Sequence, residues 1–245
     1  MLRLLLDECG GALPGDVVPV FANTGEEAEG TLIFIREMAE RWGVLIRWVE
    51  FTRDAPHWRE VDYCSASRRG EPFDTLVDWK SYLPNATERI CTEWLKVRPV
   101  ELFAASIGLP GVDRMLGIRA DEPRRVAKNR AKDDIFLPLA DRGVTQEDVL
   151  AFWREQPFNL QIRAGEGNCR LCYLKGQAQL RNVARGGGPD EAGLQRWIDR
   201  EQRVGATMRR RDPYRRIADH VRRQLPMFDA EIEEDPDLLP CACGD

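Results

Sequence analysis

A strand–helix–strand pattern near the amino terminus restricts the fold most strongly. Residues 17–21 (VVPVF) are a short apolar run, residues 28–42 repeat apolar side chains at helical spacing up to Gly43, and residues 44–49 (VLIRWV) are a second apolar run. Strands joined through one helix lie parallel in a sheet. We therefore predict an α/β fold with a Rossmann-like parallel sheet and flanking helices, although Pro19 removes one backbone donor from the first strand.

Weaker patterns extend this prediction along the chain. Short apolar runs predict further strands at 114–118 and 135–139, with a charged loop, 119–125, after the first of them. Helical patterns cover 75–82, 88–107 and 146–155. Pro99 should kink or split the second helix, because proline lacks a backbone N–H.

The carboxy-terminal third is predicted to be helical. A helix is expected over 169–184, followed by the Gly-Gly-Gly-Pro linker 186–189 and helices over 190–203 and 213–225. An acidic tail ends the chain. We predict three parts, namely an α/β domain over 1–185, a helical appendage over 186–228 and a cysteine-containing tail over 229–245.

Composition excludes several classes of protein. The net charge of −5 does not favour a dedicated nucleic-acid binder, and no run of 18 apolar residues is present, so we expect a cytoplasmic protein without a membrane partner. Seven cysteines in a reducing compartment are ligands, nucleophiles or buried thiols rather than disulfides. Only His57 and His220 are available, which argues against a histidine metal site or a Ser-His-Asp triad.

The cysteines carry the clearest chemical signal. Cys169 and Cys172 form a Cys-x-x-Cys motif, Cys91 lies 78 residues upstream, and Cys241 and Cys243 lie in the last five residues. The motif fits a redox pair, half of a zinc site or part of an iron–sulfur site, and the alternative is a chance pair of buried thiols. The remaining two cysteines lack partners at ligand spacing and are predicted to be structural thiols; they are Cys9 and Cys64.

Three segments together resemble the phosphoadenosine phosphosulfate (PAPS) reductase family. Residues 20–25 (VFANTG) are similar to the strand and Asp/Asn-Thr-Gly of that family, 91–99 (CTEWLKVRP) resemble its cysteine- and lysine-bearing segment, and 117–122 (GIRADE) resemble its Gly-x-Arg strand end. The resemblance spans about Val17 to Lys175. It implies the adenine nucleotide alpha-hydrolase-like fold of PP-loop enzymes and an oxidoreductase that reduces or transfers sulfur through an adenine nucleotide, PAPS or ATP.

The resemblance also assigns roles to the cysteines. Cluster-bearing members hold a 4Fe-4S cluster with a cysteine segment and a later Cys-x-x-Cys, which implies Cys91, Cys169 and Cys172 as ligands here, with Cys241 or Cys243 as the fourth. Zinc needs the same number of thiolates and stays an alternative. In thiol-dependent members a terminal cysteine attacks the sulfonucleotide, which implies Cys243 as nucleophile and a thiol electron donor such as thioredoxin. Incidental cysteines in a disordered tail are the other interpretation of this segment.

The same resemblance implies a nucleotide site at the strand ends. Catalytic cations would be Lys96 and Arg119, and Asp121 with Glu122 would hold Mg²⁺ if ATP were cleaved. The implied nucleotide-binding residues are Asn23, Thr24, Gly25, Arg98, Gly117 and Arg125.

The sequence departs from the family at its start. The family begins with a strand and a Ser-Gly-Gly-x-x-Ser phosphate loop, whereas residues 1–7 (MLRLLLD) look like the interior of the following helix. Either the sequence is a truncated version, which we favour, or the phosphate loop has been lost. In the second case the protein would be an inactive, metal-stabilised binding module.

An arginine-rich stretch, Arg203–Arg223, leaves a further alternative open. Its first explanation is a solvated or internally paired surface. A nucleic-acid surface is the other, and it would suit ATP-dependent sulfur modification of tRNA or DNA.

Overall fold

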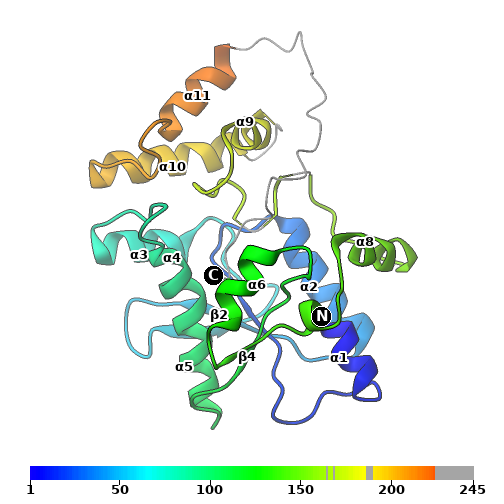
Figure 1. The fold of residues 1–245 in the computed structure, drawn as a ribbon. Helices are drawn as coiled ribbons and strands as arrows, with labels where there is room; N and C mark the ends of the chain where they lie inside the picture. Colours follow the sequence, from blue (N-terminus) through cyan, green and yellow to red (C-terminus); the bar gives the residue numbers. More distant parts are fainter. Residues whose placement is uncertain (164, 168, 186–189, 224–245) are drawn as a thin grey trace.

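The computed structural model describes residues 1–245 except 164, 168, 186–189 and 224–245 (Figure 1). The described part is a mixed α/β structure in which small sheets are flanked by helices. In chain order the elements are α1 (Leu2–Glu8), β1 (Val20–Ala22), α2 (Glu29–Trp42), β2 (Arg47–Phe51), β3 (Trp58–Val61), α3 (Glu71–Lys80), α4 (Ile90–Thr92), the π-helical turn η1 (Glu93–Val97), α5 (Arg98–Ser106), β4 (Arg114–Met115), α6 (Pro123–Arg130), β5 (Ile135–Phe136), α7 (Pro138–Asp141), α8 (Gln146–Glu155), α9 (Gln177–Arg185), α10 (Asp190–Val204) and α11 (Tyr214–Arg223).

The strands form two small sheets. In the first, β1 pairs parallel with β2, and β2 pairs antiparallel with β3. In the second, β4 pairs parallel with β5. The predicted parallel strand–helix–strand unit is therefore present, because α2 connects β1 to β2.

Helix α2 covers the first sheet with its apolar side. Leu32 and Ile35 pack in one hydrophobic cluster with Trp48 of β2. Gly43 ends the helix in the left-handed conformation with φ of 61°, which glycine adopts without steric cost. The helix that the periodicity predicts is thus confirmed to within one residue.

The helices α9, α10 and α11 lie together at one end of the molecule (Figure 1). They share one hydrophobic cluster with α3, η1 and the cysteine segment, which we define as residues 169–175. Phe73, Leu95, Leu171, Trp197 and Ile217 are fully or almost fully buried members of this cluster. The cluster includes residues on both sides of the linker, 186–189. The predicted division of the chain at residue 186 stays a prediction.

Two local predictions are corrected and one is confirmed. The helix predicted from Cys169 begins only at Gln177, because the cysteine segment is a series of turns in which Cys172 N–H donates to the Cys169 carbonyl and Lys175 N–H to the Cys172 carbonyl. The helix predicted over 88–107 is split near Pro99 as expected: the π-helical turn η1 ends at Val97, and α5 begins at Arg98, because proline cannot donate an amide hydrogen. The charged loop after β4 contains a helix, α6, that starts at Pro123.

Among the described residues, no helix is both long enough and apolar enough to span a bilayer.

Candidate cysteine site

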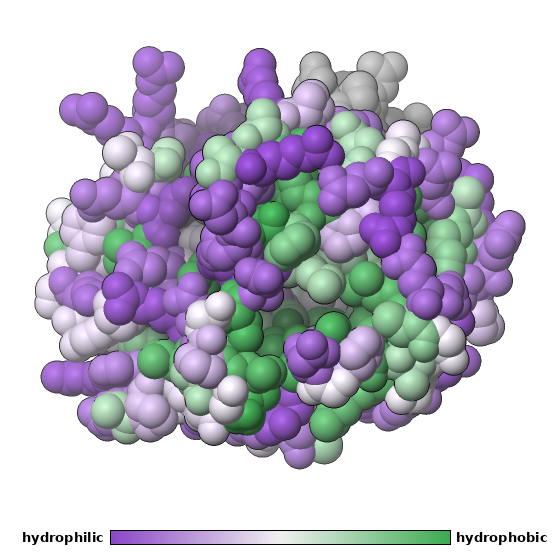
Figure 2. Space-filling model, turned by 60° about the horizontal axis from the view of Figure 1, so that its bottom comes forward, coloured by the Kyte–Doolittle hydropathy of each residue, from purple (hydrophilic) through white to green (hydrophobic). Residues whose placement is uncertain are grey.

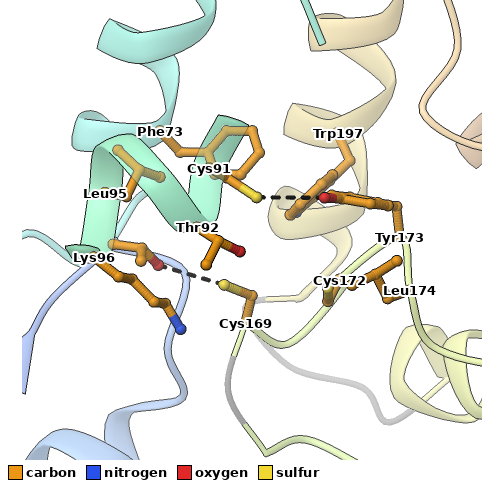
Figure 3. A pocket seen from close by; sticks show the side chains of 11 residues that line it. Phe73, Cys91, Thr92, Leu95, Lys96, Cys169, Cys172, Tyr173, Leu174 and Trp197 are labelled. Atoms are coloured by element: carbon orange, nitrogen blue, oxygen red, sulfur yellow. Dashed lines mark hydrogen bonds between the residues drawn. The ribbon is translucent and has the colours of Figure 1, made fainter. Parts of the chain in front are cut away.

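Three cysteines from distant parts of the chain line one pocket (Figure 3). Cys91 lies on the short helix α4, and Cys169 and Cys172 lie on the cysteine segment. Thr24 and Lys96 line the same pocket, so it also borders the loop that follows β1. The two cysteine motifs and the Asn-Thr-Gly segment therefore meet at one pocket.

Tyr173 faces Cys91 across the pocket. Its hydroxyl oxygen lies 3.4 Å from the Cys91 sulfur, and Figure 3 shows the two side chains pointing toward each other. Burial and the nearby Cys91 raise the pKa of Tyr173 far above its usual value. The hydroxyl therefore keeps its proton and is able to donate a hydrogen bond to the sulfur, which would favour the thiolate form.

The cysteine segment is bound directly to the loop after β1. Cys169 forms a β-bridge with Glu27, and the Arg170 N–H donates to the Glu26 carbonyl over 2.9 Å. The Thr24 hydroxyl lies 3.5 Å from the Cys169 sulfur. These contacts place the first cysteine of the motif beside the predicted nucleotide-binding loop.

Glu27 is a buried acid next to this junction. Its carboxylate accepts hydrogen bonds from the Thr24 N–H at 3.0 Å and from the Thr24 hydroxyl at 2.8 Å. Burial raises the pKa of Glu27, whereas the positive charge of Lys96 lowers it. The net rise favours the protonated, neutral form of the Glu27 carboxyl, and the charge of Lys96 offsets this only in part.

Two side chains near the carboxy terminus hold the cysteine segment from the other side. The Tyr214 hydroxyl donates to the Leu171 carbonyl. Arg209 donates to the carbonyls of Tyr173 at 2.5 Å and Lys175 at 2.7 Å. The turn conformation of the segment is therefore fixed by α11 and by the connection that precedes it.

Asn23 is not available for a ligand in the described structure. Its amide donates to the Glu50 carboxylate at 2.6 Å and to the Ser67 carbonyl at 2.9 Å, and its oxygen accepts from the Gly25 N–H. The side chain is completely buried. The Asn23 side chain therefore supports the loop after β1, and its contact with a nucleotide stays a prediction.

Gly25 is required by a close approach of two backbone segments. Its φ is 75°, and a Cβ there would lie 3.0 Å from Gly70 Cα. The Gly70 N–H also donates to the Gly25 carbonyl over 2.9 Å. A larger residue would separate the loop from the start of α3.

A buried ion-pair network connects α10 to the same loop. Arg200 pairs with Glu26 at 2.6 Å and with Asp74 at 2.8 Å, and its side chain is only 1% exposed. The Trp197 ring N–H donates to Glu26 over 3.2 Å. Glu26 is thus held by two α10 side chains while its carbonyl receives the cysteine segment.

The predicted cations do not gather at one place. Lys96 lines the pocket, but Arg98 pairs with Glu93 on the surface. At the end of β4, Arg119 pairs with Asp121, and Arg125 pairs with Glu122. Gly117, Arg119 and Arg125 are not among the residues that line the cysteine pocket, and the two acids predicted to hold Mg²⁺ are paired with arginines.

The predicted metal ligands are only partly within the described residues. Cys241 and Cys243 lie outside them. Among the described residues, no three His, Cys, Asp or Glu side chains are arranged at metal-binding distances. Cys9 and Cys64, predicted to be structural thiols, are exposed, and neither lines the cysteine pocket.

Several residues that shape the site were missed by sequence reasoning. Glu26 and Glu27 directly follow the Asn-Thr-Gly motif, and Tyr173 directly follows the second cysteine. This adjacency to a motif was the only feature of the sequence that could have pointed to them. Trp197, Arg200, Arg209 and Tyr214 carried none, because they reach the site only through tertiary packing.

Comparison with known proteins gives one informative similarity. The chain is 31% identical over 191 residues to an uncharacterized nin region protein, ORF290, of Escherichia phage lambda. The alignment covers 74% of this chain and 63% of the phage protein. No protein-family model matches the chain, and no solved structure matches it.

Proposed function

We propose that this protein is a PAPS reductase-like oxidoreductase that reduces or transfers sulfur through an adenine nucleotide. One observation carries the proposal. Cys91, Cys169 and Cys172 come from segments 78 residues apart and line one pocket together with Thr24 of the Asn-Thr-Gly loop. If Cys169 and Cys172 were only a chance pair of buried thiols, there would be no reason for Cys91 and Thr24 to line the same pocket.

The proposal includes a Rossmann-like sheet of the adenine nucleotide alpha-hydrolase type. The parallel pairs β1–β2 and β4–β5 support it, since both fit one parallel sheet. One further parallel strand between β1 and β4 would join the two pairs. On the face at the bottom of Figure 1, Figure 2 shows a hollow with largely apolar walls, and apolar walls suit a buried strand.

The donor types suit a thiolate-bound metal group, although the thiols of the described structure would have to come closer together to share one. Three thiols line the pocket, and the Tyr173 hydroxyl next to Cys91 would stabilise a thiolate. Cys91, Cys169 and Cys172 would hold a 4Fe-4S cluster, with Cys241 as the fourth ligand. When bound, such a cluster supplies a polarising, electron-accepting centre.

The remaining residues would handle the nucleotide. Lys96 offers an ammonium group to a phosphate or sulfate at the pocket, and Thr24 lies at the end of β1, where ligands of parallel sheets bind. Cys243 would attack the sulfonate sulfur, so that the sulfur–oxygen bond breaks and the adenosine phosphate leaves. A dithiol donor would then release sulfite and become a disulfide.

Anaerobic purification with quantification of iron, sulfide and zinc tests the proposal. We expect about four iron and four sulfide per chain, with a broad absorption band near ~400 nm. Cys169→Ser should lose the band and most of the iron. Cys64→Ser is the matched control, because Cys64 is exposed and does not line the pocket, and it should keep both.

Two results would contradict the proposal. One zinc per chain would indicate a structural thiolate site instead of a redox centre. Equal iron in the Cys169→Ser and Cys64→Ser variants would show that the pocket cysteines are not the ligands.

A further inference from the structure

Arginines on α11 and directly before it form a basic region that the proposed function does not use. Residues 209–223 contain seven arginines and two aspartates, although the whole chain has a net charge of −5. The charge of the protein is therefore strongly asymmetric. Such a concentration of positive charge attracts polyanions even when the net charge is negative.

The helix presents its arginines from a fixed scaffold. Tyr214, Ile217 and Ala218 are buried in the hydrophobic cluster with the cysteine segment. The opposite side of the helix carries exposed arginines, and two further exposed arginines precede the helix in sequence. The exposed members, which we call the basic surface, are Arg210, Arg211, Arg215, Arg216, Arg222 and Arg223.

These arginines differ from others on the surface in their lack of acidic partners. Arg47, Arg68 and Arg142 each form an ion pair with a glutamate. Within the basic surface, only Arg222 has an acidic partner among the described residues, and this pair with Asp219 is long, at 3.9 Å. Internal pairing within the described chain therefore does not account for the basic surface.

We infer that the basic surface binds the phosphate backbone of duplex nucleic acid. Arginine forms paired hydrogen bonds to phosphate oxygens, so six exposed guanidinium groups match a row of phosphates. A ten-residue helix is about 15 Å long, which is enough to follow several phosphates along a groove. Contacts of this kind give affinity without base specificity.

Hydrogen bonds join the element that carries the basic surface to the cysteine segment. Arg209, directly before the basic surface, donates to carbonyls of that segment, and Tyr214 on α11 donates to its Leu171 carbonyl. A duplex on α11 would therefore lie on the element that fixes the cysteine segment.

Fluorescence anisotropy with the full chain and a mixed-sequence duplex of about 20 base pairs, between about 50 and 200 mM salt, tests the inference. The test variant is Arg211→Ala/Arg215→Ala/Arg222→Ala. The control variant, Arg53→Ala/Lys128→Ala/Arg154→Ala, removes the same charge from exposed positions elsewhere. We expect the test variant to bind at least about tenfold more weakly, with a salt slope reduced by about 0.9 for each lost phosphate contact. The control should stay near wild type.

Three results would overturn the inference. The first is no binding by the wild-type chain at about 50 mM salt. The second is an equal loss of affinity in both variants, which would reflect net charge alone. The third is binding of poly-glutamate as tight as that of the duplex and equally dependent on the three arginines, which would assign the surface to an acidic polypeptide. Matching thermal unfolding of both variants ensures that the comparison reports binding.

Discussion

At the scale of single residues, buried polar groups decide which side chains matter for the site. The Leu171 carbonyl lies between the two pocket cysteines of the motif and receives its hydrogen bond from the Tyr214 hydroxyl. Both residues are buried, so water cannot easily replace the hydroxyl. A carbonyl without a partner costs free energy comparable to a lost hydrogen bond.

Tyr214→Phe should therefore destabilise the protein by about 1–3 kcal/mol, because it removes only the hydroxyl and leaves the Leu171 carbonyl unpaired. Urea unfolding measures the change. Tyr82→Phe is the control, since Tyr82 is exposed, and should change the stability by less than about 0.5 kcal/mol. Equal effects of the two substitutions would show that the Tyr214 hydroxyl does not support the segment.

Glu201 should give the stability a pH dependence of its own. It is buried and accepts hydrogen bonds from the Met208 and Tyr214 N–H groups, both at 3.0 Å. Burial raises the pKa of Glu201 above its ordinary value of 4.5, although the two N–H donors lower it in part. The folded state then holds the proton more tightly than the unfolded state, so this contribution to stability is full below about pH 4.5 and declines as the pH rises through the folded pKa.

Glu201→Gln removes that titration. The variant loses one acceptor oxygen and should be destabilised by about 1–3 kcal/mol near pH 4.5. The difference from wild type should shrink toward pH 7, by about 1.4 kcal/mol for each unit by which folding raises the pKa. Thermal unfolding across this range provides the measurement. A difference that is constant or grows with pH would contradict the raised pKa.

At the scale of elements, α10 is attached to α3 by one buried and one exposed arginine, and the buried one also reaches the loop after β1. Arg200 is 1% exposed and pairs with Glu26 and Asp74, whereas Arg203 is 45% exposed and pairs with Asp74 and Asp78. Both arginines reach the same aspartate. Each arginine therefore pairs with two carboxylates, and the two differ mainly in burial.

Arg200→Met should destabilise the protein by about 3–5 kcal/mol, because two carboxylates lose their buried partner. Arg203→Met should cost no more than about 1 kcal/mol, since exposed ion pairs contribute little. Denaturant unfolding of the two variants gives the comparison. Similar losses for both would mean that Arg200 is not a buried anchor of α10.

The elements themselves were predicted where local patterns suffice. The periodic helices α2 and α8 match the prediction closely, and α8 begins with a capping box formed by Thr145 and Asp148. Strand positions are shifted, for example from 17–21 to Val20–Ala22, because Pro19 and the turn before it leave only the end of the apolar run to pair with β2. Strand β3 was missed, since its central residues are charged and exposed.

The candidate site was predictable only in its cysteines and loop. The spacing of Cys91, Cys169 and Cys172 indicated a shared site, and the three line one pocket. The arrangement around them depends on long-range contacts that no local pattern records. Arg200 and Arg209 belong to an arginine-rich sequence, yet one is buried against Glu26 and the other binds backbone carbonyls.

At the scale of the whole molecule, two hydrophobic clusters are connected by polar contacts. The larger cluster joins α3, the cysteine segment and α9–α11, and the smaller one lies between α2 and β2. The loop after β1 connects them, because Asn23 binds Glu50 of β2 while Glu26 binds Arg200 of α10. A connection through buried polar groups favours unfolding as one unit.

We therefore expect Ile217→Ala and Leu32→Ala to lower the stability of the whole protein in the same way. Ile217 is buried in the larger cluster and Leu32 in the smaller, and each truncation should cost about 2–5 kcal/mol. Unfolding followed by tryptophan fluorescence and by circular dichroism should give coincident single transitions, with a lower midpoint and an unchanged slope. Two separate transitions in Ile217→Ala alone would show that the helices after residue 189 form an independent unit, and that the predicted boundary at 186 divides the protein.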